Sequence, residues 1–184
     1  MDLECKNSVQ ETPIQFAAFA CRNLEIVKYL FEKKCVLDSL SDTGNNLLHF
    51  AFQRNENLQI IKYLVENSGQ DINLRNTYGN SPFNLASIYC SDIEKIKFLV
   101  ELKSDLNILN NYGENVVHLS CEDNPSLDVV KYLIEITNYD MKQLNDENES
   151  ALHLACFSNS NLESKKKKKF LFYFILFYFI FFFF

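Results

Sequence analysis

The chain has 184 residues, of which 47% are hydrophobic, so it can build one ordinary domain or a short repeat array and is too apolar to be a disordered tail. Its formal net charge is −6, but Lys165 to Lys169 supply five of the 18 basic residues. Residues 1–164 therefore carry 13 basic and 24 acidic residues, a net charge of −11. Such a surface repels phosphates, which argues against nucleic-acid binding and favours a partner with a basic face.

The beginning of the chain carries no pattern of a secretory signal. Residues 1–10 are polar and acidic, whereas a signal peptide has an apolar stretch behind a basic start. The six cysteines form no C-x-x-C pair, which is typical of reduced thiols in a cytosolic protein. They are Cys5, Cys21, Cys35, Cys90, Cys121 and Cys156. We therefore expect a cytoplasmic protein without disulfides.

From residue 12 onwards, two kinds of amphipathic segment alternate, and each recurs every 34 or 35 residues. The first kind begins with Thr, Asn or Ser, which cap helix N-termini, and has small residues near its end. Its copies occupy residues 12–18, 46–52, 81–87, 115–121 and 150–156. The second kind places apolar residues at i, i+3 and i+6, a broad helical stripe. Its copies occupy residues 24–30, 58–64, 93–99 and 127–133.

Tight turns precede the shorter segments. Gly44, Gly79 and Gly113 lie just before three of them, and Asn148 takes the same place before the last copy. Glycine, and less readily asparagine, tolerates the positive φ that a tight hairpin turn requires. Each repeat is therefore predicted to contain a hairpin turn, a short inner helix and a longer outer helix.

The predicted fold class is all-α, a solenoid of helix-turn-helix units with short hairpin turns and about four and a half repeats. Residues 1–7 are an N-terminal extension, and the array covers residues 8–163. Its repeats are assigned to residues 8–41, 42–75, 76–110, 111–144 and, incompletely, 145–163. Residues 164–184 form a Lys-rich block and a Phe-rich low-complexity tail.

These segments resemble the ankyrin repeat family. Glu11 to Ala18 and Asn148 to Ala155 approximate the family's G-x-T-P-L-H-x-A-A pattern, and Leu24 to Leu30 matches its L-E-I-V-K-Y-L outer helix almost verbatim. Asp71 to Asn73 and Asp105 to Asn107 match its D-V-N loop. The resemblance covers residues 8–163, and its strength comes from five copies in register. It departs from the family at the turn between helices, where residues other than the usual Gly stand.

The resemblance implies that the chain holds another protein on a concave face made of hairpin tips and inner helices. Partner-contacting positions would flank each turn glycine and lie at the end of each inner helix. These positions are Asp42, Thr43, Asn45, Gln53, Arg54, Thr77, Tyr78, Asn80, Ile88, Tyr89, Asn111, Tyr112, Glu114, Glu122 and Asp123. Tyr78, Tyr89 and Tyr112 are the strongest candidates, because tyrosine joins apolar area to a polar tip. Alternatively, Tyr78 and Tyr112 could pack on the neighbouring repeat.

Three histidines could suggest a metal or catalytic site, but His49, His118 and His153 occupy one equivalent repeat position, shared with Gln15 and Asn84. Successive equivalents in such a stack lie about 10 Å apart. That is too far to share one ion, whose ligands lie about 2 Å from it. We interpret them as hydrogen-bonding struts between repeats. No nucleophile with a base and no phosphate loop stands out, so we expect no enzyme activity, metal or cofactor.

The fifth copy stops being a repeat at residue 164. Its outer helix would need apolar residues where Ser164, Lys165 and Lys168 stand, and residues 170–184 consist entirely of Phe, Tyr, Leu and Ile. A lysine block before 15 apolar residues resembles a membrane tail anchor. As a helix, however, 15 residues span about 22 Å against roughly 30 Å of hydrocarbon. We favour a second account, in which A-rich and T-rich low-complexity DNA is translated here.

The sequence thus predicts a cytoplasmic, monomeric, non-enzymatic module that binds another protein. The alternative is a membrane-tethered recruiter that uses residues 170–184 as its anchor. Either protein could be a truncated part of a longer array.

Overall fold

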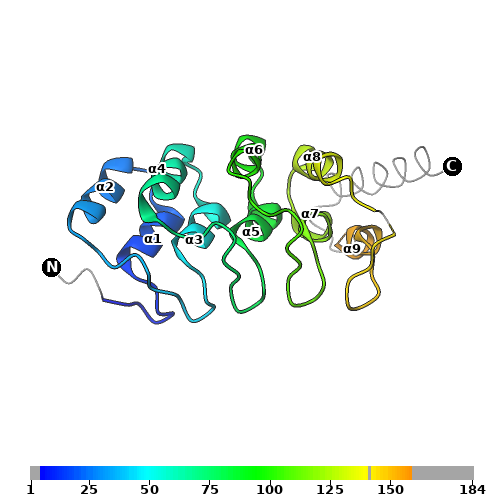
Figure 1. Ribbon diagram of the computed structural model, residues 1–184, viewed down its shortest axis with the longest axis horizontal. Coiled ribbons are helices and arrows are strands. Elements are labelled where there is room, and N and C mark those ends of the chain that lie inside the picture. The colour runs from blue at the N-terminus through cyan, green and yellow to red at the C-terminus, as the bar shows by residue number, and fades with distance from the viewer. Residues whose placement is uncertain (1–4, 141, 159–184) are drawn as a thin grey trace.

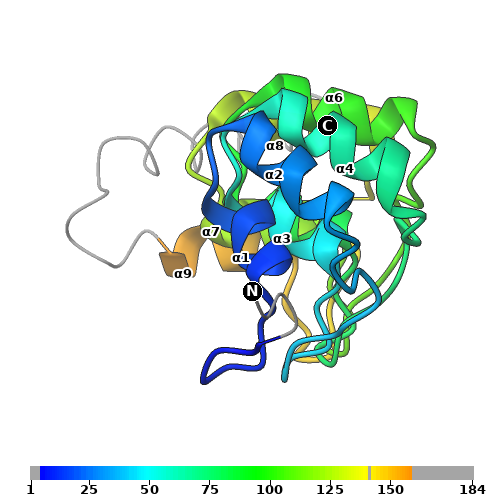
Figure 2. The same cartoon turned by 90° about the vertical axis from the view of Figure 1, so that its left-hand side faces the viewer.

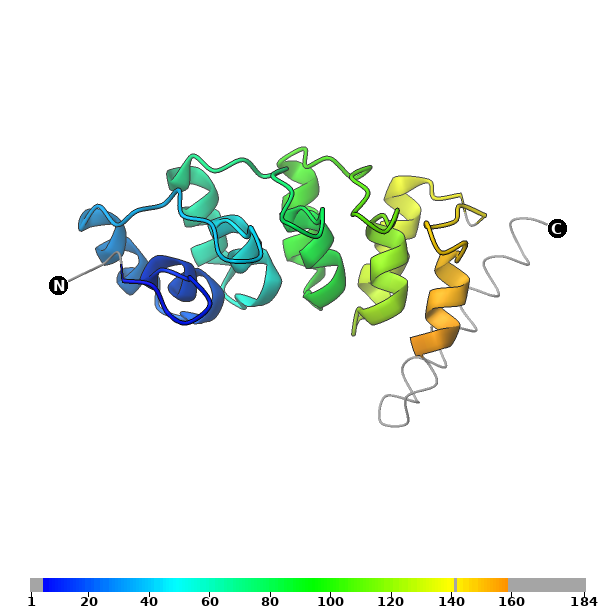
Figure 3. The same cartoon turned by 90° about the horizontal axis from the view of Figure 1, so that it is seen from below.

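The computed structural model describes residues 5–140 and 142–158. In this part of the chain, short inner helices and outer helices alternate and stack into an elongated array (Figures 1 and 3). The inner helices are α1 (Pro13–Ala20), α3 (Leu47–Arg54), α5 (Pro82–Tyr89), α7 (Val116–Asp123) and α9 (Ala151–Ser158). The outer helices are α2 (Leu24–Glu32), α4 (Leu58–Ser68), α6 (Ile93–Glu101) and α8 (Leu127–Thr137). The described residues contain no strand, and the predicted helix-turn-helix solenoid is confirmed.

The inner helices begin where their caps predict. Thr12 is the N-cap of α1: its side chain accepts a hydrogen bond from the backbone N–H of Gln15, and the Gln15 side chain accepts one from the backbone N–H of Thr12. This reciprocal capping box satisfies two amides that would otherwise lack partners. Asn46 with His49 and Ser81 with Asn84 repeat it in α3 and α5. The repeated geometry places the third helical residue at the same point of each repeat.

No helix pair has a core of its own. Each inner helix packs against the next one along the array, α1 on α3, α3 on α5, α5 on α7 and α7 on α9. The apolar residues at these junctions, such as Leu48, Phe83 and Val117, are almost completely buried. Burying one such side chain stabilises a fold by about 1.5–3 kcal/mol. Every pair therefore depends on its neighbour for the burial that keeps it folded.

The hairpins project to one side of the inner helices (Figure 2) and follow one another along the array (Figure 1). They are joined by backbone hydrogen bonds: the Thr77 N–H donates to the Thr43 carbonyl at 3.0 Å, and the Asn111 N–H donates to the Tyr78 carbonyl at 2.9 Å. The Asp146 N–H continues this ladder to the Tyr112 carbonyl at 2.9 Å. The ladder fixes neighbouring hairpin tips relative to one another.

An asparagine braces the inside of most hairpins. Asn76 Oδ1 accepts hydrogen bonds from the backbone N–H groups of Tyr78 and Asn80, both at 3.0 Å. Asn7, Asn110 and Asn145 make the same pair of bonds in their own hairpins. Asparagine favours such turns because its side chain can bond to backbone groups a few residues on.

No helix in residues 5–140 and 142–158 is long and apolar enough to cross a membrane. The predictions about the Lys-rich block and the Phe-rich tail at 164–184 lie outside the described residues. The residue boundaries assigned to the repeats remain predictions.

The hairpin tip requires glycine at residue 79, and we expect substitution there to lower the free energy of unfolding. Gly79 has φ +77°, and a Cβ there would lie 2.7 Å from the Asn111 backbone nitrogen, the donor of the ladder bond. Gly69 has a similar φ of +64°, but a Cβ there would meet nothing within 4 Å. Gly69→Ala should therefore cost only the backbone strain, about 1–2 kcal/mol. Gly79→Ala should cost at least about 1 kcal/mol more, because the ladder must shift.

Urea denaturation of both variants, followed by circular dichroism, gives the two free energies of unfolding. Equal losses in Gly79→Ala and Gly69→Ala would mean that the hairpin ladder does not constrain the tip.

Candidate functional site

The angle between hairpins and inner helices contains a cavity of about 450 Å³. We call it the hairpin-side cavity. It is walled by the hairpins before α1, α3 and α5 and by those three helices. Of the residues predicted to contact a partner, it brings together Asp42, Thr43, Asn45, Gln53, Tyr78, Asn80, Ile88 and Tyr89.

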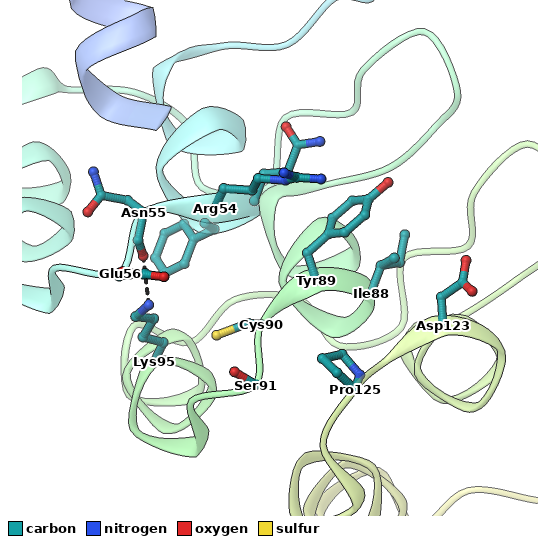
Figure 4. Close-up of a pocket in the computed structure, with 12 residues that line it drawn as sticks. Arg54, Asn55, Glu56, Ile88, Tyr89, Cys90, Ser91, Lys95, Asp123 and Pro125 are labelled. Carbon is teal, nitrogen blue, oxygen red and sulfur yellow. Dashed lines mark hydrogen bonds between the residues drawn. The ribbon is translucent and has the colours of Figure 1, made fainter. Parts of the chain in front are cut away.

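A second cavity, of about 410 Å³, lies where the inner helices end and the turns to the outer helices begin (Figure 4). We call it the turn-side cavity. Gln53, Ile88 and Tyr89 line both cavities, so the two adjoin along α3 and α5. The turn-side cavity adds Arg54 and Asp123 to the predicted contact residues. Thr77, Asn111, Tyr112, Glu114 and Glu122 line neither cavity.

The tyrosines of this face remain open to solvent. Tyr78 is 49% exposed, Tyr112 is 51% exposed and Tyr89 is 44% exposed. About half of each hairpin tyrosine is therefore not taken up by packing on the neighbouring repeat. The backbone carbonyls of the two hairpin tyrosines, Tyr78 and Tyr112, accept ladder bonds from the next hairpin. These bonds fix the Cα positions of both tyrosines.

The residues that follow the turn glycines are buried instead. Asn45, Asn80 and Glu114 are each only 9% exposed. Asn76 Nδ2 donates to Asn45 Oδ1 at 2.8 Å, and Asn110 Nδ2 donates to Glu114 Oε2 at 2.7 Å. Asn45 and Glu114 thus hold hairpins in shape, and Glu114 has little surface left for a partner.

The C-terminal end of the face is acidic. Glu122 lies half-buried on α7. Burial is the main cause that raises the pKa of its carboxyl, and the negative charges of neighbouring carboxylates raise it further. These are Asp123, Glu114, Glu149 and Glu147. A cation brought to this end would relieve the repulsion among them.

Two turn asparagines connect successive helix pairs, a role that could not be assigned from their replacement of a glycine. Asn55 Nδ2 donates to the backbone carbonyls of Ala18 and Cys21, at 2.8 and 3.1 Å. Asn124 Nδ2 donates in the same way to the carbonyls of Ser87 and Cys90, at 2.7 and 2.9 Å. Each asparagine satisfies carbonyls at the end of the preceding inner helix, where intrahelical donors run out.

The third repeat has Cys90 at this turn position, and Lys95 supplies the missing bond. The buried Lys95 ammonium reaches back from α6 and donates to the Asn55 carbonyl at 2.6 Å (Figure 4). Ile60 and Val129 occupy the equivalent positions on α4 and α8. A lysine among apolar equivalents was the signal in the sequence that could have identified this substitute.

The residues at the histidine position are struts, as predicted. His49 Nε2 lies 2.9 Å from the Asn80 carbonyl, and His118 Nε2 lies 3.3 Å from the Gln143 carbonyl, each in the following hairpin segment. Gln15 Nε2 and Asn84 Nδ2 donate to the carbonyls of Ser39 and Ile108, which are the repeat equivalents of Gln143. Within the described residues, His153 makes the cap half of the pattern, accepting from the Ser150 N–H at 3.1 Å.

His49 is held neutral by its surroundings. Its Nε2 faces a carbonyl and must carry the proton, so the unprotonated Nδ1 accepts from the Asn46 N–H at 3.2 Å. Burial lowers the pKa of His49 to about 4, although the Asn80 and Leu74 carbonyls favour the charged form. Burial also lowers the pKa of His118.

Among the described residues, no three His, Cys, Asp or Glu side chains lie close enough to hold a metal ion. Complete burial raises the pKa of the Cys121 thiol to about 12, so it is protonated near neutral pH and is a poor nucleophile.

Comparison with known proteins agrees with this geometry. A family model described as ankyrin repeats (3 copies) matches residues 1–76 and 83–166. An ankyrin repeat protein of fowlpox virus (strain NVSL) is 53% identical to the chain over 38 residues. That match spans 21% of this chain and 7% of the relative, so the relative's own activity and partners do not carry over.

The lowered pKa of His49 predicts a loss of stability in mild acid. An ordinary histidine has a pKa near 6.5, so between about pH 6.5 and pH 4 the unfolded chain binds a proton that the folded chain does not bind. The contribution is fully present above pH 6.5 and falls by about 3 kcal/mol as the pH drops to 4. His49→Gln keeps both strut bonds, as Gln15 does, and removes this titration.

Free energies of unfolding from urea titrations at pH 7 and pH 4.5 give the comparison. The wild-type chain should lose about 2–3 kcal/mol more than His49→Gln between the two pH values. Equal losses would show that His49 titrates normally.

Proposed function

The chain belongs to the ankyrin repeat family, and we propose that it is a non-enzymatic module that holds another protein against its concave face. Ankyrin repeats are generally protein–protein interaction modules, and the family is generally not enzymatic. The observation that carries the proposal for this face is its set of half-exposed tyrosines: Tyr78 and Tyr89 line the adjoining cavities, and Tyr112 lies on the next hairpin tip. Half-exposed aromatic side chains beside a cavity are typical of binding hot spots.

The rigidity of the hairpins supports this proposal. Backbone hydrogen bonds join the tips that carry Tyr78 and Tyr112, and an asparagine braces each of these hairpins from inside. A surface that is already ordered loses less conformational entropy when a partner binds. The tyrosines therefore stand on a preorganised platform.

The charge of the face indicates the kind of partner. Residues 1–164 carry a net charge of −11, and carboxylates gather around Glu122 at the C-terminal end of the face. Complementary charge accelerates association and excludes like-charged partners. We propose that the partner presents a basic surface, and that the module acts in the cytoplasm as a monomer.

The membrane-tethered alternative rests on the sequence of residues 165–184 alone. Membrane fractionation of the whole chain and of a variant that ends at residue 164 distinguishes the cases. Recovery of only the longer form in membranes would favour tethering, and insoluble aggregates of it would argue against an anchor.

Removing the hairpin tyrosines should weaken partner capture. The double substitution Tyr78→Ala and Tyr112→Ala removes two half-exposed rings from the face, and hot-spot tyrosines are worth about 2 kcal/mol or more each. Proteins retained from a cell lysate by the immobilised 184-residue chain should therefore bind the double variant at least about tenfold more weakly. Circular dichroism should remain unchanged, because neither ring is part of the buried core.

Tyr29→Ala is the matched control, because Tyr29 is 48% exposed but lies on the outer helix α2. It should retain capture. Undiminished capture by the double variant would remove the hairpin tips from the binding surface.

A further inference from the structure

The hairpin-side cavity has an aromatic and aliphatic wall. Phe19, Tyr78 and Tyr89 contribute rings to its lining, and Leu85 and Ile88 contribute aliphatic side chains. At about 450 Å³, its volume lies in the range of pockets that enclose a small molecule or a large side chain. The wall favours a ligand group with both an apolar stem and a flat surface.

The charges that line this cavity have one sign. Glu11 and Asp42 are among its lining residues, and none of its lining residues is a lysine or an arginine. Carboxylates combined with aromatic ring faces attract a cation, the rings through their quadrupoles and the carboxylates through charge. The cavity therefore favours a positively charged group.

The chain itself places a guanidinium on this aromatic wall. The Arg54 guanidinium carbon lies 5.9 Å from the centre of the Phe19 ring, within the range of a cation–π contact. Arg54 lines the adjoining turn-side cavity (Figure 4), while Phe19 lines the hairpin-side cavity. Phe19 thus already has a guanidinium at its ring, and Tyr78 and Tyr89 are the tyrosine rings of the wall that an incoming guanidinium would meet.

A hydrogen-bond acceptor at the cavity also lacks a partner. Asn80 stands at the same hairpin position as Asn45, whose Oδ1 accepts a hydrogen bond from Asn76 Nδ2 of the next hairpin. The donor that would serve Asn80 in the same way is Asn110 Nδ2, but it donates to Glu114 instead. Asn80 Oδ1 is consequently buried without a hydrogen-bond partner within the described residues, and Asn80 lines the cavity. This oxygen has almost no accessible surface, so an incoming N–H group would bond to it only if the Asn80 amide turned toward the cavity.

We propose that the hairpin-side cavity receives an arginine side chain of the bound protein, an inference that rests on the proposed function of the concave face. The guanidinium stacks on the aromatic wall and pairs with Asp42, with the Glu11 carboxylate adding to the attraction, and its N–H groups meet the amide and hydroxyl acceptors of the lining. Arginine fits better than lysine, because a planar group with five donors uses both the ring faces and several acceptors.

The probes are N-acetyl-arginine amide, its lysine counterpart and its citrulline counterpart, which keeps the shape of arginine without the charge. Each is titrated into the whole ¹⁵N-labelled chain, and amide chemical shifts report the affinity and the location. Arginine should shift the amides of Asp42, Tyr78 and Tyr89 and bind about fivefold or more tightly than citrulline, with lysine between them.

Asp42→Asn should weaken arginine binding about threefold or more and leave citrulline binding unchanged. Asp128→Asn, which makes the same charge change on the outer helix α8, is the control and should leave both unchanged. Citrulline binding as tightly as arginine, shifts that map away from the cavity, or equal effects of the two variants would overturn the proposal.

These titrations are independent of the capture of a partner by the hairpin tyrosines. Failure of capture with specific arginine binding would contradict the proposed function alone. Capture that depends on Tyr78 and Tyr112 without specific arginine binding would contradict this inference alone.

Discussion

Each helix pair of this chain can bury its apolar side only against the pair beside it, and the rest of the structure depends on that constraint. The inner helices pack one on the next. Side chains at the junctions add hydrogen bonds between repeats, from Asn55 and Lys95 near the turns and from His49 at a helix cap. Each of these side chains donates to a backbone carbonyl of an adjacent repeat, so burial and hydrogen bonding are satisfied together. Stacking in turn brings the hairpins close enough to form their backbone ladder.

Because buried residues hold the stack together, the exposed side chains of the face can differ from one repeat to the next. Equivalent hairpin positions carry Thr43, Tyr78, Tyr112 and Glu147, while the asparagines that brace the hairpins recur. An ordered backbone therefore presents an uneven surface, with aromatic rings beside the cavities of the first three repeats and carboxylates at the C-terminal end. This uneven, acidic surface is the basis of our proposal that the partner presents a basic face.

The sequence predicted the features that recur in register. The spacing of His49 with Gln15 and Asn84 was enough to identify the struts, because an amide can replace an imidazole only where both act through hydrogen bonds. The hairpin asparagines could have been found in the same way, since Asn7, Asn76, Asn110 and Asn145 all stand four residues before the end of a hairpin. Lys95 could have been singled out as a lysine among apolar equivalents, but its partner Asn55 could not be named from the sequence, because it lies 40 residues away. The burial of Asn45, Asn80 and Glu114 was also missed, because residues on either side of a turn were treated alike although only one side faces solvent.

Amide hydrogen exchange tests most directly whether stacking makes the hairpins one rigid platform. The informative amides belong to Thr77, Asn111 and Asp146, which donate the bonds between hairpin tips. If the ladder is held by the buried junctions, these amides exchange as slowly as those of the central helix α5, because they open only when the stack opens. Exchange of these three amides at the rate of free loops, with α5 still protected, would contradict the account.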